Sequence, residues 1–140
     1  MSKPSVFFDQ LDFIHLGSTN RKEVIDSLGS PKDYRFEDDF KVIYTYPRKG
    51  IEITIKMGHI ATSSVVTSIS VNKPFQGYSS NSLVLGMEFD IAQKICKELY
   101  LEEISQEDLV TYSLKKEKIR FQIKKLKGKL AQINISKELS

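Results

Sequence analysis

The sequence holds a single cysteine, two histidines and no long apolar run among its 140 residues. One cysteine, Cys96, excludes an internal disulfide and fits a reducing compartment. No stretch approaches the roughly 20 apolar residues that a bilayer-spanning helix needs. Asp9 and Asp12 interrupt the N-terminal segment where a signal peptide needs a continuous apolar run. We therefore expect a cytoplasmic protein that has no membrane segment.

Side chains that usually carry catalysis or bind metal are scarce and scattered. His15 and His59 lie in different kinds of segment, and no histidine, cysteine or acidic residues follow a metal-ligand spacing. The seven glycines stand at separate turns, so the sequence contains no glycine-rich phosphate loop. Cys96 falls on the apolar side of a predicted helix, where a thiol behaves as a small hydrophobe. The sequence thus predicts a protein that is not an enzyme and needs no cofactor or metal.

What is present is the composition of one globular domain. The apolar fraction is 40% and the aromatic fraction 10%, values that disordered chains do not reach. A chain of this length usually builds a single core. We expect one domain spanning 1–140.

The first half of the chain predicts one helix and three strands. Asn20 and Glu23 form a capping-box pattern, and Gly29 followed by Pro31 is a typical stop signal, so a helix is expected over 21–28. A loop around RFEDDF (35–40) follows, and then strands whose apolar residues alternate with polar ones. The residues expected to face inward are Val24, Ile25, Leu28, Val42, Tyr44, Tyr46, Ile51, Ile53, Ile55, Val65, Ile69 and Val71.

The second half repeats this order of elements. The corresponding inward residues are Ile91, Ala92, Ile95, Cys96, Leu99, Val110, Tyr112, Leu114, Ile119, Phe121, Ile123, Ile133 and Ile135. The separation is 68 residues from Val42 to Val110 and from Ile51 to Ile119. We interpret the chain as two repeats, about 14–72 and 83–137, joined by 73–82.

The pattern predicts an α+β fold built by tandem duplication of a helix plus antiparallel hairpins. Each half alone has about 60 residues, which is marginal for independent folding. Each predicted strand has one apolar and one polar side, as in a sheet covered on one side only. We expect one antiparallel sheet with the helices on one face. The strand near 130–136 is expected at an edge, where it could pair with another chain, so the oligomeric state stays open.

These motifs resemble those of the β-lactamase-inhibitor-protein-like fold, which includes the small outer-membrane lipoprotein A type domains. The resemblance rests on Leu-Gly-Ser-Thr-x-x-x-Glu-Val-(x)3-Leu-Gly-x-Pro at 16–31, on Gly-Ile-x-Ile-x-Ile at 50–55 and on a closing Val-x-x-Ile strand. The second Leu-Gly-Met and the Pro-Phe-x-Gly linker at 74–77 are similar to the two-repeat inhibitor architecture. Small cytoplasmic bacterial immunity proteins use comparable repeat units. The resemblance covers most of the chain and implies a fold rather than an activity.

Three departures separate this sequence from the secreted and lipid-anchored members. Residues 97–100 read Lys-Glu-Leu-Tyr where a second Leu-Gly-x-Pro would stand. The lipid-accepting cysteine and export signal of the lipoproteins are absent, as are the disulfides of the secreted inhibitors. All three departures favour a cytoplasmic member of the group.

Positive charge is concentrated in one segment although the net charge is only +3. Eight basic residues lie between 115 and 129, with Glu117 as the one acidic residue among them. A nucleic-acid-binding ribbon would show such a run, but no aromatic residue alternates on the face of Arg120 and Lys124, where base stacking would need it. The run also suits an acidic protein partner, or it simply keeps a hairpin solvated and unpaired.

We expect a non-enzymatic protein-binding inhibitor, in particular an immunity protein that neutralises a cognate bacterial toxin by direct binding. An assembly or structural factor that binds an endogenous protein complex is the alternative, and a nucleic-acid-associated domain is a third. The partner is expected to be a toxin domain with an acidic surface, and nucleic acid is not the expected ligand. Tyr34 and Phe36 are predicted as exposed anchors. The polar contacts are predicted at Lys56, Arg120, Gln122, Lys124, Gln132 and Asn134.

Overall fold

The computed structural model describes residues 14–58, 64–73, 75, 83–98, 102–106, 108–114 and 118–137. It is an α+β fold dominated by its sheet, as the alternating pattern predicts. The elements are α1 (Arg21–Leu28), β1 (Asp33–Asp38), β2 (Lys41–Tyr46), β3 (Ile51–Lys56), β4 (Val65–Asn72), α2 (Phe89–Lys97), β5 (Glu102–Ser105), β6 (Leu109–Leu114), β7 (Ile119–Leu126) and β8 (Lys129–Lys137). His59 and Leu99, and most of the predicted 73–82 join, lie outside the described residues.

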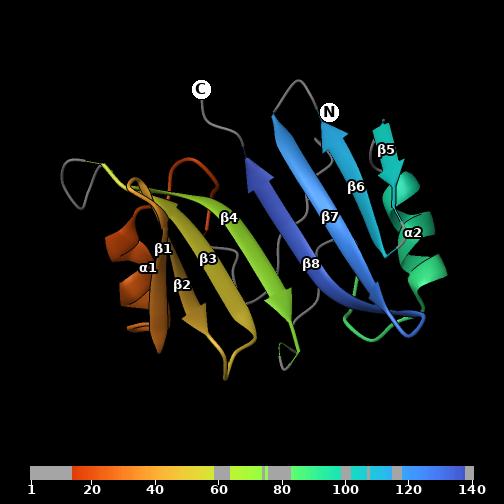
Figure 1. Cartoon of the computed structure of the whole chain (residues 1–140), viewed down its shortest axis with the longest axis horizontal. Helices are drawn as coiled ribbons and strands as arrows, with labels where there is room; N and C mark the ends of the chain where they lie inside the picture. The colour runs from red at the N-terminus through yellow and green to blue at the C-terminus, as the bar shows by residue number, and fades with distance from the viewer. Residues whose placement is uncertain are drawn as a thin grey trace.

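All eight strands form one antiparallel sheet in the order β1-β2-β3-β4-β8-β7-β6-β5 (Figure 1). Each half of the chain makes a four-stranded meander, and the last strands of the two halves, β4 and β8, pair at the centre. The prediction of an edge strand at 130–136 is therefore wrong. Both neighbours of β8 are occupied, by β4 and β7, and the edges are β1 and β5.

One face of the sheet carries the core, and both helices pack on that face (Figure 1). Inward residues alternate with outward ones along β3, where Ile51, Ile53 and Ile55 are buried while Lys56 is exposed. Tyr112 and Phe121 fill the same core in the second half. Burying each such side chain stabilises the fold by about 1.5–3 kcal/mol. Neither of the two described helices covers the other face.

Helix α1 begins and ends where its sequence signals predict. The Asn20 side chain accepts from the Glu23 backbone N–H at 2.9 Å, and the Glu23 carboxylate accepts from the Asn20 backbone N–H at 3.0 Å. Both bonds of the capping box are therefore made. Gly29 follows the helix with φ of +85°, which is unfavourable for residues with a Cβ.

Helix α2 presents a different side to the core from the one expected. Its buried residues are Phe89, Ala92 and Cys96, whereas Ile91 is 51% exposed. The helix begins at Phe89, and the ring of this residue is buried. The buried side of the helix therefore lies about one residue away from the side of Ile91 and Ile95 that the sequence predicts. Ile95 packs only partly against the core.

The sequence interpretation also missed two strands and one bulge. β1 and β5 are edge strands, and every residue of β1 is exposed, so neither shows a buried alternation that could be recognised. The β3–β4 pairing shifts between Thr54 and Ile55 of β3, leaving Thr67 of β4 as the extra residue. The bulge puts Val66 rather than Val65 into the core.

Candidate binding groove

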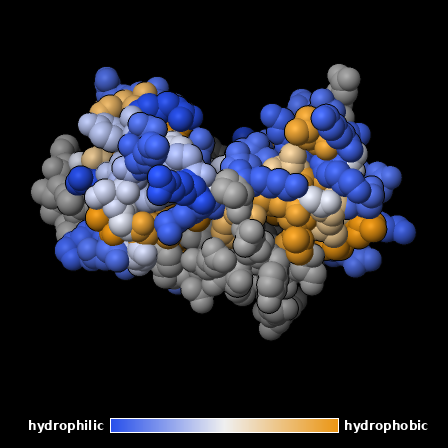
Figure 2. Space-filling model, turned by 90° about the horizontal axis from the view of Figure 1, so that it is seen from below, coloured by the Kyte–Doolittle hydropathy of each residue, from blue (hydrophilic) through white to orange (hydrophobic). Residues whose placement is uncertain are grey.

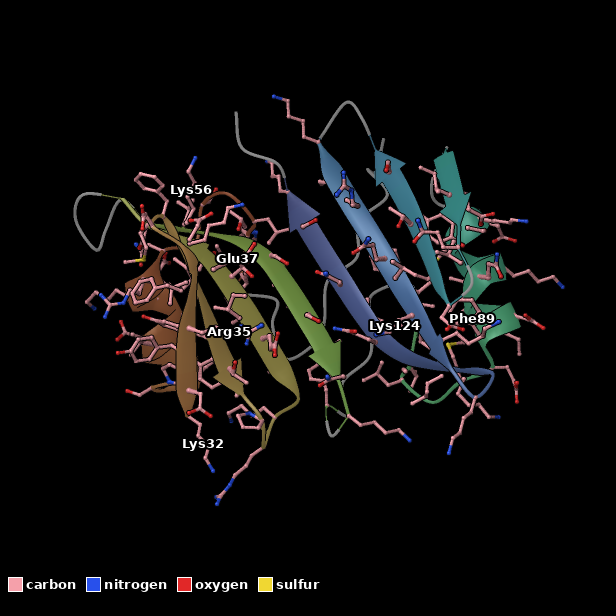
Figure 3. The ribbon with its side chains drawn as sticks, viewed as in Figure 1. Lys32, Arg35, Glu37, Lys56, Phe89 and Lys124 are labelled. Atoms are coloured by element: carbon pink, nitrogen blue, oxygen red, sulfur yellow. The ribbon has the colours of Figure 1, made fainter. Side chains whose placement is uncertain are left out.

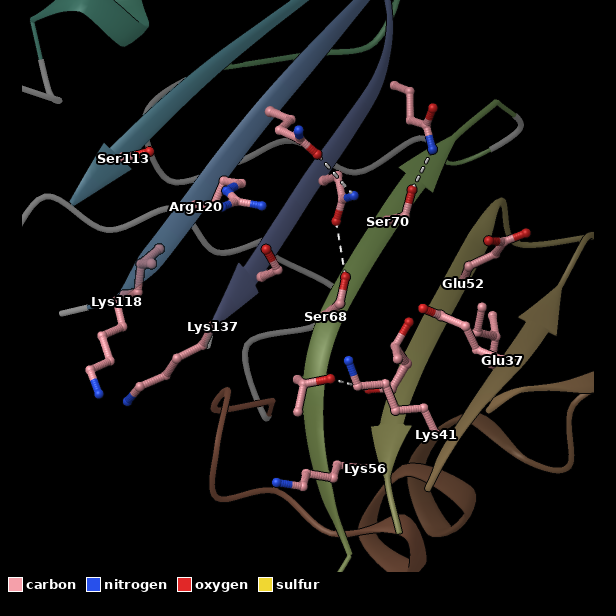
Figure 4. A pocket seen from close by; sticks show the side chains of 18 of the residues that line it. Glu37, Lys41, Glu52, Lys56, Ser68, Ser70, Ser113, Lys118, Arg120 and Lys137 are labelled. Atoms are coloured by element: carbon pink, nitrogen blue, oxygen red, sulfur yellow. Dashed lines mark hydrogen bonds between the residues drawn. The ribbon is translucent and has the colours of Figure 1, made fainter. Parts of the chain in front are cut away.

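The uncovered face of the sheet forms a groove of about 1200 Å³, to which every strand contributes lining residues (Figure 4). Figure 2 shows the molecule hollowed between two lobes, with hydrophilic residues along both sides of the hollow. The groove follows from the alternation of the strands. Apolar residues turn toward the helices, and their neighbours, mostly polar, turn toward the groove.

Four strands share a hydrogen-bonded network of neutral side chains on the floor of the groove. Asn134 on β8 is at its centre. Its amide donates to the Gln122 carbonyl at 3.4 Å, and its own carbonyl accepts from the Ser68 hydroxyl at 3.0 Å. Gln122 in turn donates to Thr111 at 3.2 Å. The network ties β6, β7, β8 and β4 together, so these side chains are held in fixed positions.

A second bond crosses the centre of the sheet beside this network. The Gln132 amide on β8 donates to the Ser70 hydroxyl on β4 at 2.6 Å. The junction of the two halves is thus linked on the core side by apolar packing, including the Ile69–Ile135 pair, and on the groove side by amides and hydroxyls.

Four lysines lie at one end of the groove, which we call the mouth. Lys41 begins β2 and Lys56 ends β3, while Lys118 precedes β7 and Lys137 ends β8. In an antiparallel sheet the start of one strand lies beside the end of the next, so all four reach the same end. Figure 4 shows Lys118 and Lys137 extending in the same direction on one side and Lys56 on the other.

Two of the mouth lysines are directly opposite each other. Lys41 and Lys56 are register partners in the β2–β3 pair, and no ion pair joins either to an acidic side chain among the described residues. Like charges placed opposite each other in a sheet are destabilising. Lys41 is also opposite Asp38 in the β1–β2 pair, so at the rim of the groove it stands between one opposite charge and one like charge.

Arg120 lies one step inside the mouth. It is flanked in register by Ser113 on β6 (Figure 4) and by Ser136 on β8. Ser136 pairs in turn with Ser68 on β4, so a row of three hydroxyls and one guanidinium crosses the sheet. Within the described part of the chain, Arg120 makes no ion pair and no side-chain hydrogen bond.

The lining of the groove is net positive. Its charged members are five basic side chains, Lys41, Lys56, Lys118, Arg120 and Lys137, and two acidic ones, Glu37 and Glu52. Both carboxylates come from the first half, and Glu52 is engaged by Arg35 at 3.9 Å. The second half contributes only positive charge among its described lining residues.

The structure brings five of the predicted contact residues into the groove. Lys56, Arg120, Gln122, Gln132 and Asn134 all line it. The sixth, Lys124, pairs with Gln132 and so shares the groove face. It is exposed near the opposite end from Lys56 (Figure 3) and is not among the lining residues. Partner contact at these residues stays a prediction.

The two predicted aromatic anchors lie on the other face of the sheet. Tyr34 pairs with Tyr44 and Phe36 with Val42, both core-facing residues, so the anchors point to the helix side of edge strand β1. Each is 64% exposed, as expected of anchors. Their rings contact each other edge-to-face, with centroids 6.1 Å apart. A partner held in the groove alone would not reach them.

Sequence reasoning did not single out several groove residues. Lys41, Lys118 and Lys137 stand at strand ends, where a lysine usually signals only solvation, and Ser113 and Ser136 are small polar residues without a motif. The missing signal was positional: the ends of strands distant in sequence meet at the mouth only because β4 pairs with β8.

The buried thiol has no reactive character. Cys96 is fully buried, and burial, with a smaller effect of the nearby Glu103 carboxylate, raises its pKa to about 12. At neutral pH it therefore stays a thiol and is a poor nucleophile. No group of His, Cys, Asp or Glu side chains within the described ranges could hold a metal ion. None of the helices in those ranges is long and apolar enough to cross a membrane.

Comparison with known proteins gives one informative likeness, at the level of fold. No family model matches the sequence, and no curated protein shows significant similarity to it. Among solved structures, the crystal structure of a DUF4309 family protein (YjgB) from Bacillus subtilis is similar, with a TM-score of 0.56 and 12% sequence identity. The match covers 93% of this chain and 86% of that chain. At this identity the likeness concerns the fold alone.

Proposed function

We propose that this chain is a non-enzymatic binding protein that holds an acidic surface of another protein in its groove. In its most specific form the proposal is an immunity protein that neutralises a bacterial toxin by covering it. The observation that carries the binding proposal is the groove itself, an open face of about 1200 Å³ lined by fixed polar groups with an excess of positive charge.

The fixed floor supports a binding role because it lowers the entropic cost of association. Gln122, Asn134 and Gln132 already hold each other or neighbouring hydroxyls. Side chains that are ordered before binding lose little freedom on contact, where a mobile one would cost about 0.5–1.5 kcal/mol. A partner therefore meets a surface whose donors and acceptors are already placed.

The charge of the lining supports an acidic partner. Arg120 and Lys137 have no acidic partner within the described residues, and Lys41 stands opposite Lys56. An acidic partner surface would offset both, and it would accelerate encounter through electrostatic attraction. Two opposed lysines do not stabilise the fold, and they add no more solubility than two separated lysines would. Binding of an acidic partner explains their placement more readily.

We further propose that the sheet arose by duplication of a helix-and-meander unit. The strand order reads identically from both edges toward the centre, with β1 to β4 on one side and β5 to β8 on the other. The central register supports this: a shift of 64 residues converts the Ile69–Ile135 pair into Ile133–Val71, which is also a pair. At the 68-residue spacing Glu52 corresponds to Arg120. Under duplication, the two halves have diverged in charge within one groove.

The immunity role rests on this groove together with the cytoplasmic character expected from the sequence. An immunity protein must bind one toxin tightly while leaving related proteins free. An assembly factor with the same groove would instead bind a component of a host complex. Nucleic acid is disfavoured because base stacking needs exposed aromatic side chains, and Tyr34 and Phe36 lie on the opposite face from Arg120.

Affinity capture with matched variants tests the proposal. The tagged wild-type chain, an Arg120→Glu/Lys137→Glu variant and a Lys49→Glu control are each used to capture partners from source cells, with elution in high salt and identification by mass spectrometry. Lys49 is exposed in the β2–β3 turn and does not line the groove. We expect one stoichiometric partner with wild type and control, and a marked loss with the groove variant.

The identity of the captured species separates the roles. A toxin domain would support the immunity role, and a component of a host complex would favour the assembly factor. Equal capture by all three proteins would contradict binding in the groove. Recovery that disappears after nuclease treatment would contradict a protein partner.

A further inference from the structure

Unused hydrogen-bond donors are gathered at one place in the groove. On the floor, Gln122, Asn134 and Gln132 each make at least one side-chain hydrogen bond across the sheet. Toward the mouth, Arg120 and the hydroxyls of Ser113 and Ser136 make no side-chain hydrogen bond to another described residue, and Lys137 makes no ion pair with one. The floor side chains are thus bonded to one another, while the side chains of the next row make no such bond among the described residues.

The register places these donors within reach of one small ligand. Ser113, Arg120 and Ser136 are direct neighbours across three strands. Residues opposite each other on one face have Cβ atoms about 4.5–5.5 Å apart. Lys137 follows Ser136 at the end of β8 and lines the groove, although its register partner Ile119 packs against the core. Lys118 precedes β7 with φ of +58°, an uncommon backbone conformation for a lysine. Figure 4 shows Ser113, Lys118, Arg120 and Lys137 on one side of the groove.

We propose that Ser113, Arg120 and Ser136, with Lys118 and Lys137 beside them, form a subsite for a single oxyanion group. This inference rests on the proposed function, and it names the chemistry that the partner inserts into the groove. A guanidinium donates two parallel hydrogen bonds to a carboxylate or phosphate, and charge-assisted bonds of this kind are roughly twice as strong as neutral ones. The two serine hydroxyls supply donors on either side.

The surrounding charges limit the subsite to this position. On the other half of the groove, Glu52 occupies the place that corresponds to Arg120 at the 68-residue spacing, and it is held by Arg35 at 3.9 Å. That half therefore already contains its own carboxylate. An incoming oxyanion is expected at Arg120 rather than elsewhere along the floor.

Anion titration of the whole chain tests the inference without any protein partner. Backbone amide chemical shifts are followed by NMR while sodium sulfate, phosphate or acetate replaces sodium chloride at constant ionic strength. We expect saturable shifts confined to the amides around Ser113, Arg120 and Ser136. Arg120→Gln should weaken the apparent affinity about ten-fold, as expected for loss of a charged donor. Lys49→Glu should leave the affinity unchanged, and the amide spectrum reports whether each variant is folded.

The three anions distinguish the possible sources of the oxyanion. Saturation by acetate as well as sulfate and phosphate would assign the subsite to a carboxylate side chain, whereas saturation by sulfate and phosphate alone would assign it to a phosphate or sulfate ester. Shifts that rise linearly with all anions, or that persist in Arg120→Gln, would overturn the inference. Capture of a partner that is lost in Arg120→Glu/Lys137→Glu would still stand in that case, so the two proposals fail separately.

Discussion

Replacing Lys56 by glutamate should stabilise the fold and weaken partner binding. Lys56 faces Lys41 across the β2–β3 pair, and Asp38 is the register partner of Lys41 on the other side, in the β1–β2 pair. No described ion pair joins either lysine to an acidic side chain. Lys56→Glu converts this repulsion into a cross-strand ion pair. Opposite charges at such positions contribute roughly 0.2–1 kcal/mol, and like charges cost a similar amount.

The magnitude is reduced because Lys56 is exposed and solvent screens the pair. We expect the free energy of unfolding to rise by about 0.5–1 kcal/mol, which raises Tm by ~2–4 °C in a chain of this size. Lys56→Gln removes only the repulsion and should give about half of that gain. Association with the captured partner should become slower in both variants, and more so with glutamate.

Urea denaturation at low and high salt measures the effect on stability. The gain should shrink at high salt, because a Debye length of about 3 Å at 1 M leaves little interaction between exposed charges. A destabilised Lys56→Glu variant, or a gain independent of salt, would refute the reasoning about the lysine pair. A stabilised variant that binds its partner with unchanged kinetics would show that the pair does not serve binding.

Three further outcomes follow from the structure. Asn134→Ala should destabilise the chain by about 1–3 kcal/mol in urea denaturation, because it leaves groups of the floor network without partners; a neutral effect would mean that water replaces the amide. Tyr34→Ala/Phe36→Ala should leave association with a groove-bound partner unchanged, since both rings lie on the opposite face, and a large loss would show that the partner wraps around edge strand β1. Stability should fall as pH rises from about 9 to about 12, because burial, aided by Tyr44, raises the pKa of Tyr46 to about 12 and burial, aided by Glu103, raises that of Cys96 to about 12, so the unfolded chain loses these protons first; a flat profile over that range would contradict their burial.

The inward faces of the inner strands could be predicted from the sequence because each has a period of two. Ile51, Ile53 and Ile55 are buried as the alternation indicates, and so are Phe121 and Ile123. The capping box of α1 is equally local, since Asn20 and Glu23 are three residues apart. Signals of this kind need no knowledge of how distant segments pair.

The errors in predicting β1, the bulge in β4 and the position of β8 arise from features that a local sequence pattern does not contain. β1 has no buried side and therefore no alternation to recognise, although Tyr34 and Phe36 were correctly expected to be exposed. A bulge at Thr67 buries Val66 in place of Val65, and no residue type in the sequence predicts such a bulge. The placement of β8 at the centre depends on pairing between residues more than 60 positions apart.

The candidate site was found in part for the same reason. Arg120, Gln122 and Asn134 were expected on the uncovered face because alternation fixes which side of a strand each residue occupies. Lys137 and Ser136 become part of the groove only through the register of β7 with β8. Tyr34 lies on the opposite face from the polar contacts, because its register with Tyr44 turns it to the helix side, and that register could not be predicted from local pattern.

The most direct test of the central claim is the association rate of the captured partner with Arg120→Glu/Lys137→Glu, measured beside wild type and Lys49→Glu at low and high salt. Binding in a positively charged groove predicts that the groove variant associates more slowly at low salt, that the difference narrows at high salt, and that Lys49→Glu retains the wild-type rate apart from a small, general effect of net charge. If Arg120→Glu/Lys137→Glu and Lys49→Glu slow association equally, the groove acts only through the net charge of the protein. Unchanged rates in both would place the binding surface elsewhere on the molecule.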